Sequence, residues 1–150
     1  MNLIKTSPIF TSAAIDSPWY FSYSSTNDNV VSAYELFDGD VENMGWHSST
    51  EQTDWKTCEE YIILGNTASK IKLSTLKIYG RRHSDGLGQI PINFGVYGSN
   101  DNINYKLIKD FNYGTELDAS FDLGRVYYYN YFKILFYDKN TTWGRIILDE

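Results

Sequence analysis

Two polar segments of the chain carry residue types that could take part in chemistry. The first begins with Asp-Gly-Asp at residues 38–40 and continues into Trp-His-Ser-Ser at residues 46–49. The second is a polar stretch that runs from Tyr97 to Tyr105. Neither segment holds a nucleophile and a base at a spacing that is typical of covalent catalysis. Both are therefore predicted to present polar side chains on loops, which favours binding over turnover.

Two other clusters contain catalytic residue types but lack catalytic geometry. Glu59 and Glu60 are adjacent in a predicted strand, so their side chains point to opposite faces. Glycoside hydrolysis needs two carboxyl groups about 5–9.5 Å apart in one cleft. The His-Ser-Asp run at residues 83–85 is consecutive, whereas a catalytic triad is assembled from distant segments. We therefore expect this protein not to be an enzyme.

The composition indicates one globular domain over residues 1–150. Hydrophobic residues make up 42% of the chain and charged residues 21%, which is typical of a folded rather than a disordered protein. The formal charge of −6 argues against nucleic acids and anionic membranes as partners, because both attract basic patches. No apolar run approaches the ~20 residues that span a bilayer, so no membrane span is expected.

The single cysteine, Cys58, excludes a disulfide within the chain. It lies beside two glutamates, which disfavour a thiolate, so a packing role is favoured over a catalytic one. The first residues lack the charged and apolar regions of a signal peptide. The cellular location therefore stays open, although an extracellular surface or a virion is favoured over the role of a cytosolic enzyme.

The hydrophobic pattern predicts strands and almost no helix. No window of 11 residues or more has an apolar period of 3.6 residues, and short apolar segments alternate with polar turns. The predicted strands cover residues 59–64, 73–79, 92–97, 105–109, 120–123, 127–137 and 145–148. The longest of them is aromatic and aliphatic almost throughout, which indicates burial on both faces. Strands without covering helices predict an antiparallel sandwich of two sheets.

The first part of the chain, over about 35 residues, has a less regular pattern. Trp19, Tyr20 and Phe21 are consecutive aromatic residues after Pro18. They are predicted either to close one end of the sandwich or to protrude from it, and the first alternative is favoured. Residues 22–29 are polar and are predicted to form a loop.

Six short motifs follow one another in a recognisable order. They are LFDGD with WHSS (residues 36–49), W with YIILG (55–65), LKIY with an Arg (76–82), NFGVYGSND (93–101), FDLG (121–124) and YFKI (131–134). Together they resemble the discoidin domain, the C-type domain of coagulation factors, and bacterial galactose-type carbohydrate-binding modules, over about residues 33–148. The resemblance implies an all-β, eight-stranded antiparallel jelly-roll sandwich with its ligand among loops at one end. It also places Trp46 in the core, and Trp55 is expected either to seal an end of the sandwich or to lie in a loop.

The resemblance implies a turn at Asp38 and Asp40 that can hold a structural calcium ion, with Asn43 near the position of a customary Thr. Carboxylate and backbone oxygens are suitable ligands for calcium. The alternative is a hydrogen-bonded Asp-Gly turn without a metal. Two departures favour this alternative: the turn is one residue longer than usual, and Arg145 stands where the family supplies a Glu ligand. Both interpretations stay open.

The resemblance further implies a sugar site made of a His, an Arg, an Asn and an aromatic residue. The matching positions are His47, Arg82, Asn93 and Trp143. Arg and Asn offer fixed donors to sugar hydroxyls, and an aromatic face packs against the apolar side of a sugar ring. The structural alternatives are a buried neutral His47, an Arg82 in a salt bridge at the rim, and an Asn93 that only ends a strand. Trp143 is predicted to be exposed, because its polar loop has no obvious core to fill.

The leading hypothesis is a non-catalytic module that binds a terminal galactose-type sugar with millimolar-to-micromolar affinity. Its partner would be a glycan or a host-surface polysaccharide. The alternative is a structural or adhesion protein, for example a virion or tail-fibre component, that uses the same fold for protein contacts. The two roles are compatible, because such a particle can display a sugar-binding domain.

Overall fold

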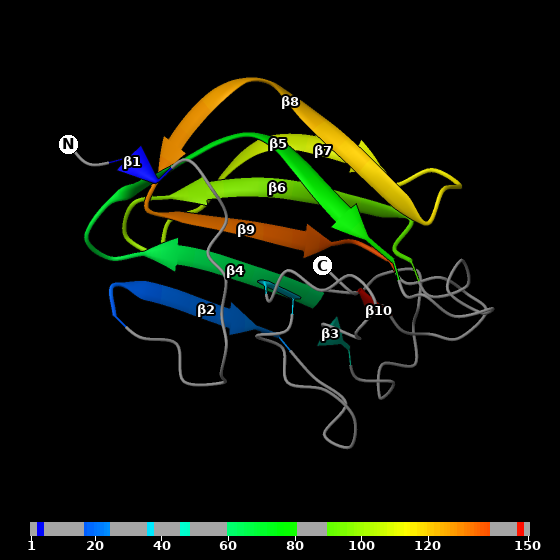
Figure 1. Cartoon of the computed structure of the whole chain (residues 1–150), viewed down its shortest axis with the longest axis horizontal. Coiled ribbons are helices and arrows are strands. Elements are labelled where there is room, and N and C mark those ends of the chain that lie inside the picture. The colour runs from blue at the N-terminus through cyan, green and yellow to red at the C-terminus, as the bar shows by residue number, and fades with distance from the viewer. Residues whose placement is uncertain are drawn as a thin grey trace.

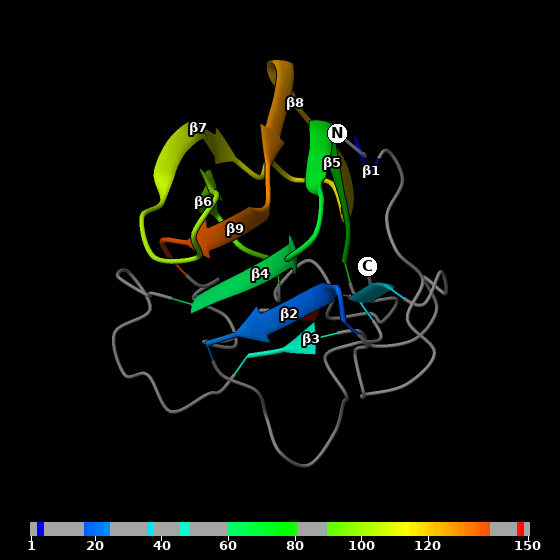
Figure 2. The same ribbon diagram turned by 90° about the vertical axis from the view of Figure 1, so that its left-hand side faces the viewer.

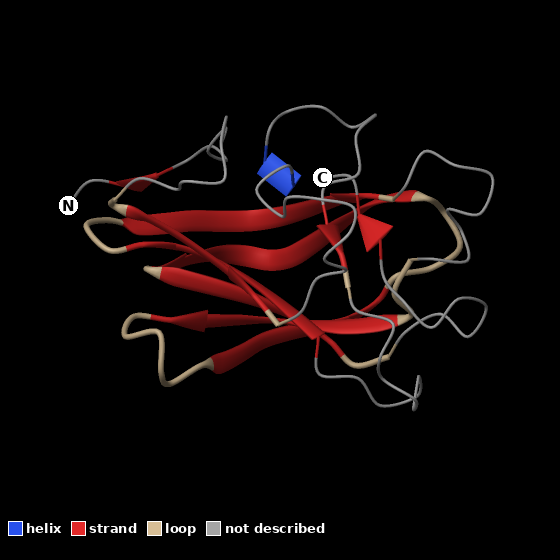
Figure 3. Ribbon diagram, turned by 90° about the horizontal axis from the view of Figure 1, so that it is seen from below, coloured by secondary structure: helices blue, strands red, loops and turns tan. Residues whose placement is uncertain are grey.

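The chain folds into strands throughout the part that the computed structural model describes, which is residues 3–4, 17–24, 36–37, 46–48, 60–80, 90–138 and 147–148. The longer strands are β2 (Trp19–Tyr23), β4 (Glu60–Asn66), β5 (Lys70–Tyr79), β6 (Asn93–Ser99), β7 (Lys106–Asn112), β8 (Asp118–Tyr129) and β9 (Tyr131–Phe136). Two-residue strands are β1 (Leu3–Ile4), β3 (Trp46–His47) and β10 (Ile147–Leu148). The described residues contain no α-helix, only one short 3₁₀ turn at residues 36–37 (Figure 3). No helix in this part is long and apolar enough to cross a bilayer.

Two sheets face each other across the core (Figures 1 and 2). The five-stranded sheet has the order β2-β4-β9-β6-β7, and the three-stranded sheet has the order β1-β5-β8. All strand pairs within them are antiparallel except β1 with β5. β3 and β10 form a separate antiparallel pair. The prediction of an antiparallel β-sandwich is therefore confirmed.

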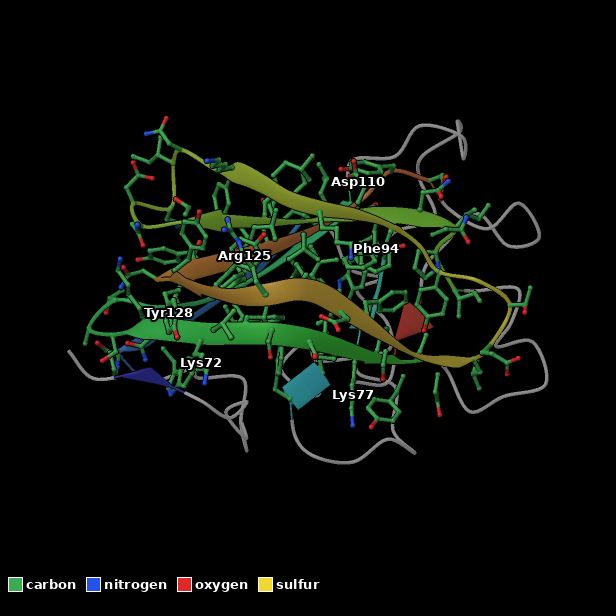
Figure 4. The ribbon with its side chains drawn as sticks, turned by 90° about the horizontal axis from the view of Figure 1, so that it is seen from above. Lys72, Lys77, Phe94, Asp110, Arg125 and Tyr128 are labelled. Carbon is green, nitrogen blue, oxygen red and sulfur yellow. The ribbon has the colours of Figure 1, made fainter. Side chains whose placement is uncertain are left out.

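Aromatic side chains from both sheets fill the space between them. Strand side chains alternate between the two faces of a sheet, and the inward positions of β6 and β9 hold Phe94, Phe132 and Phe136. The Phe94 ring is fully buried and lies 4.8 Å, edge to face, from the ring of Phe121 on β8. Figure 4 shows Phe94 between the strands of the two layers. This contact couples the five-stranded sheet to the three-stranded one.

The predicted strand over residues 127–137 is wrong, because the chain turns at Asn130. β8 ends at Tyr129 in one sheet, and β9 begins at Tyr131 in the other. The Asn130 side-chain amide donates hydrogen bonds to the carbonyl oxygens of Asn66 (3.0 Å) and Ser69 (3.2 Å). The turn was missed because tyrosines continue on both sides of it, so the apolar pattern is not interrupted.

Trp19, Tyr20 and Phe21 belong to β2, which is an edge strand of the five-stranded sheet. They are partly buried, and Trp19 and Phe21 pack against the core, so they do not protrude from the sandwich. Phe21 pairs with Leu64 on β4, and its ring packs edge to face against Phe37 at 5.5 Å. Ser22 and Tyr23 continue the same strand, so the expected loop over residues 22–29 is wrong at these two positions.

The predicted hairpin between residues 92 and 109 is confirmed as β6 and β7. The Asp101 carboxylate holds its turn by accepting hydrogen bonds from the backbone N–H groups of Ile103 (2.9 Å) and Asn104 (2.8 Å). It also accepts the Asn104 side-chain amide at 2.7 Å and the Ser99 hydroxyl at 2.9 Å. These donors, with Asn104 first, keep the pKa of Asp101 well below its ordinary value, because they stabilise the charged form.

Candidate functional site

One end of the sandwich collects several of the strand ends that bear on the predicted sugar site. We call it the Asn93 end and define it by residues 79–80, 90–93, 112–118 and 136–138. Asn93 pairs with Asn112, Phe94 pairs with Phe136, and Tyr79 pairs with Asp118. These strand ends lie at the right-hand side of Figure 1. Segments that are far apart in the sequence therefore meet at this end.

Asn93 is held at this end by a hydrogen-bond network. Its side-chain amide donates to the Asp138 carboxylate (2.9 Å), and its side-chain oxygen accepts from the Asn112 amide (3.1 Å). An Asn amide has two N–H donors and two acceptor lone pairs. One donor and one lone pair of Asn93 are therefore left for a ligand. The structure shows that these bonds fix the orientation of the Asn93 side chain between two strand ends.

Asp138 organises the end but was not singled out from the sequence. One of its carboxylate oxygens accepts both the Ile92 N–H (3.1 Å) and the Asn93 N–H (2.8 Å). It lies two residues after the end of β9 and satisfies backbone donors at the start of β6, 45 residues away from Asn93 in sequence. An Asp just after an apolar strand indicates local capping, but only the pairing of β6 with β9 makes these partners available.

Replacing Asp138 with Ala is expected to lower the free energy of unfolding by about 1–3 kcal/mol, because it removes the acceptor for two backbone N–H groups. Because the Asn93 amide loses its acceptor, the binding of any ligand at this end is also expected to become weaker. Asp138→Asn is the matched control, since it keeps one acceptor oxygen. Urea unfolding of both variants measures the first effect. Equal losses in the two variants would show that the acceptor oxygen is not what matters.

His47 is placed near the same end through its neighbour Trp46. Trp46 is fully buried, and its ring stacks on Phe136 with centroids 5.7 Å apart. Phe94 is the residue after Asn93. Its ring packs on the same Phe136 ring, with centroids 6.1 Å apart. The predicted core position of Trp46 is confirmed. His47 and Asn93 thus each adjoin a residue that packs on Phe136, and the backbone of His47 pairs with Ile147.

The remaining predicted positions lie outside the described residues. They are the sugar-site residues Arg82 and Trp143 and the calcium-site residues Asp38, Asp40 and Asn43. The nearest described residues before Arg82 and Trp143 are Gly80 and Asp138, and both belong to the Asn93 end. Within the described part, no three His, Cys, Asp or Glu residues are grouped to hold a metal ion. Calcium at the Asp-Gly turn stays a prediction, as do the roles of Cys58, Trp55 and residues 83–85.

A buried carboxylate lies at the beginning of β4. Glu60 is 2% exposed, pairs in register with Phe136, and accepts a hydrogen bond from the hydroxyl of Ser24. The alternation along β4 turns its side chain toward the interior. It therefore cannot form a shared catalytic pair with an adjacent strand residue, whose side chain faces the other way. Glu60 is accordingly packed in the interior at the Asn93 end rather than placed in an open cleft.

Comparison with known proteins gives a clear match in structure and none in sequence. No family model and no curated protein matches the chain. The family 32 carbohydrate-binding module of Clostridium perfringens NanJ, solved in complex with galactose, is 16% identical, with a TM-score of 0.71 over 89% of this chain and 91% of that chain. A module of C. perfringens GH89 in complex with GalNAc-β-1,3-galactose is 14% identical, with a TM-score of 0.72 over 89% of this chain and 92% of that one.

A third structure extends the range of ligands among these neighbours. The family 32 module of AlyQ, in complex with 4,5-unsaturated mannuronic acid, is 13% identical, with a TM-score of 0.64 over 87% of this chain and 90% of that chain. The TM-scores establish the fold, whereas sequence identities this low do not establish the ligand. The protein has the discoidin-like β-sandwich fold of the family 32 carbohydrate-binding modules.

Proposed function

We propose that this protein is a non-catalytic carbohydrate-binding module that holds a terminal galactose-type sugar at the Asn93 end. The observation that carries the proposal is the likeness, over 89% of the chain, to a module solved with galactose bound. The network around Asn93 supports it, because it leaves an oriented donor and acceptor at the place where the strand ends meet. Sugars of this kind are displayed outside cells, so we propose an extracellular or virion setting.

Each residue of the proposed sugar site has a distinct role. Asn93 offers one N–H and one lone pair to neighbouring sugar hydroxyls. Arg82 adds donors in a fixed geometry, and His47 adds a donor or an acceptor according to its tautomer. Trp143 supplies a ring that packs on the apolar face of the sugar. Such small polar ligands exchange water for protein, so a millimolar-to-micromolar dissociation constant is expected.

A glycan array followed by calorimetric titration tests this proposal. Galactose-terminated glycans are expected to bind. Trp143→Ala is expected to raise the dissociation constant by about tenfold or more. Trp143→Phe is the matched control, because it keeps an aromatic face and should keep most of the affinity. Absence of heat with every galactose-type glycan would reject the proposal.

Thermal unfolding with and without a chelator tests the proposed calcium ion at Asp38, Asp40 and Asn43. A metal that binds only the folded state raises the melting temperature. A structural calcium site would be identified if chelation lowered the melting temperature of the parent protein but not that of Asp38→Asn. An unchanged melting temperature would favour the metal-free Asp-Gly turn.

A further inference from the structure

The face of the five-stranded sheet that points away from the core carries a concentration of tyrosines. Lys133 lies near the middle of this face, because the residues on either side of it in β9, Phe132 and Ile134, belong to the core side. The register places Lys133 between Ile63 on β4 and Tyr97 on β6. The strands that form this face are stacked from β7 down to β2 in Figure 2, on the side away from β5 and β8.

Three tyrosine rings surround the ammonium group of Lys133. Its Nζ lies 4.3 Å from the ring centroid of Tyr105, 5.6 Å from that of Tyr97 and 6.0 Å from that of Tyr61. We call these four residues the lysine–tyrosine cluster. Ring faces attract a cation but do not use its three N–H donors. Among the described residues, no carboxylate or other hydrogen-bond acceptor contacts this ammonium.

The carboxylates close to the cluster are already engaged. Asp101 is held by the donors of its own turn. Asp110 accepts the hydroxyl of Tyr137 at 2.6 Å, and that hydroxyl lies 2.7 Å from the hydroxyl of Tyr97. Burial of Lys133 lowers the pKa of its ammonium from the ordinary value. A cation that has lost part of its hydration attracts an anion more strongly than a fully hydrated one.

Two glycines allow tyrosine side chains to lie close against this face. A Cβ at Gly65 would be 2.2 Å from Cδ1 of Tyr131, so the Tyr131 ring rests on the backbone there. A Cβ at Gly95 would be 2.1 Å from the hydroxyl of Tyr137. Tyr20 packs edge to face on Tyr131 at 5.7 Å. Aromatic surface and hydroxyl groups therefore lie beside the Lys133 ammonium, and these tyrosines are only partly buried.

We propose that this face binds an acidic saccharide, with the sugar carboxylate on Lys133 and the sugar rings against the surrounding tyrosines. The unused N–H donors match a carboxylate, the ring faces match the apolar sides of sugars, and the tyrosine hydroxyls match sugar hydroxyls. A protein partner fits less well, because the centres of protein interfaces are depleted in lysine. The surface is separate from the Asn93 end, and the inference does not depend on galactose binding there.

The test is a calorimetric titration of the full chain with tetramers of galacturonic acid and of mannuronic acid. The methyl-esterified tetramers are the neutral counterparts. At least one acidic tetramer is expected to bind, and its ester to bind about tenfold more weakly, because a hydrogen bond to a charged group is lost. Lys133→Met is expected to cause a similar loss. Lys133→Arg should retain binding, because it keeps the charge.

Two matched variants separate this site from other parts of the molecule. Lys77→Met removes an exposed lysine on β5 in the other sheet, labelled in Figure 4, and should leave the affinity unchanged. Trp143→Ala should also leave it unchanged, whereas it should weaken galactose binding at the Asn93 end about tenfold or more. Lys133→Gln repeats the charge removal in case Lys133→Met folds poorly.

Several results would overturn the inference. No binding of either acidic tetramer, or equal binding of acid and ester, would show that Lys133 does not hold a sugar carboxylate. Loss with Trp143→Ala but not with Lys133→Met would place the acidic sugar at the Asn93 end. A change from dimer to monomer in sedimentation of Lys133→Met, without an effect of sugar, would identify a second copy of the chain as the occupant.

Discussion

Phe94→Ala is expected to lower the free energy of unfolding by about 3–5 kcal/mol, the usual cost of deleting a buried aromatic ring. Phe94 is 0% exposed. Its ring contacts Phe111 on β7 (5.4 Å), Phe121 on β8 (4.8 Å) and Phe136 on β9 (6.1 Å). The substitution therefore removes contacts that join both sheets and leaves a cavity that the surrounding rings cannot fill without moving.

Urea unfolding followed by tyrosine and tryptophan fluorescence measures this effect. Leu107→Ala is the control, because Leu107 lies on the same hairpin but is 44% exposed, and it should change stability by less than about 0.5 kcal/mol. Phe94→Leu should fall between the two. A loss for Phe94→Ala as small as that for Leu107→Ala would contradict the position of Phe94 at the centre of the core.

Trp46→Ala is expected to have a second large effect, again about 3–5 kcal/mol in the free energy of unfolding. Trp46 is 0% exposed and stacks on Phe136, and it pairs with Leu148 in the short β3–β10 ladder. Loss of the indole removes the packing that anchors this ladder. Because His47 is the next residue of β3, the variant is also expected to lose affinity for any ligand that His47 contacts.

Trp46→Phe separates the two consequences. It keeps a ring against Phe136 and is expected to recover most of the affinity while remaining less stable than the parent. Thermal unfolding gives the stability, and a sugar titration well below the melting temperature gives the affinity of the folded protein. If Trp46→Ala bound sugar as well as the parent did under these conditions, His47 would not depend on this anchor.

Three strands with clear local signals were predicted well. β5, β6 and β7 occur where the sequence indicated them, with boundaries extended by a few residues. Polar and apolar residues alternate along β5 apart from one bulge, and the β6–β7 turn is rich in Asn and Asp, which favour turns by bonding their own backbone. Local chemistry was sufficient in these segments, because the signal and the structure depend on the same few neighbouring residues.

Strands defined by distant partners were predicted less well. The aromatic run over residues 127–137 contains a change of sheet at Asn130, and its side-chain amide is satisfied by Asn66 and Ser69. Likewise, Trp19–Tyr23 became an edge strand because β4 offers it a ladder. In both cases the deciding partners are distant in sequence, as for Trp19 with Asn66 and Asn130 with Ser69, and no local pattern contains them.

The candidate site shows the same division. Asn93 was identified from a resemblance of motifs, and the structure adds that Asp138 and Asn112 orient it. Lys133 was noted only as part of a motif, because a lysine within an apolar strand has no evident partner in sequence. Its environment is made by tyrosines from β4, β6 and the end of the hairpin turn, and only the sheet order brings them together.

By itself, the sequence indicated that the protein is an all-β sandwich and that Trp46 belongs to its core. These properties follow from residue type and from the alternation of side chains along a strand. Only the tertiary structure decided where the chain changes sheets, which acid holds Asn93 in place and which rings surround Lys133. Those features depend on contacts between separate strands, and strand order is set by the packing of the whole core rather than by neighbouring residues.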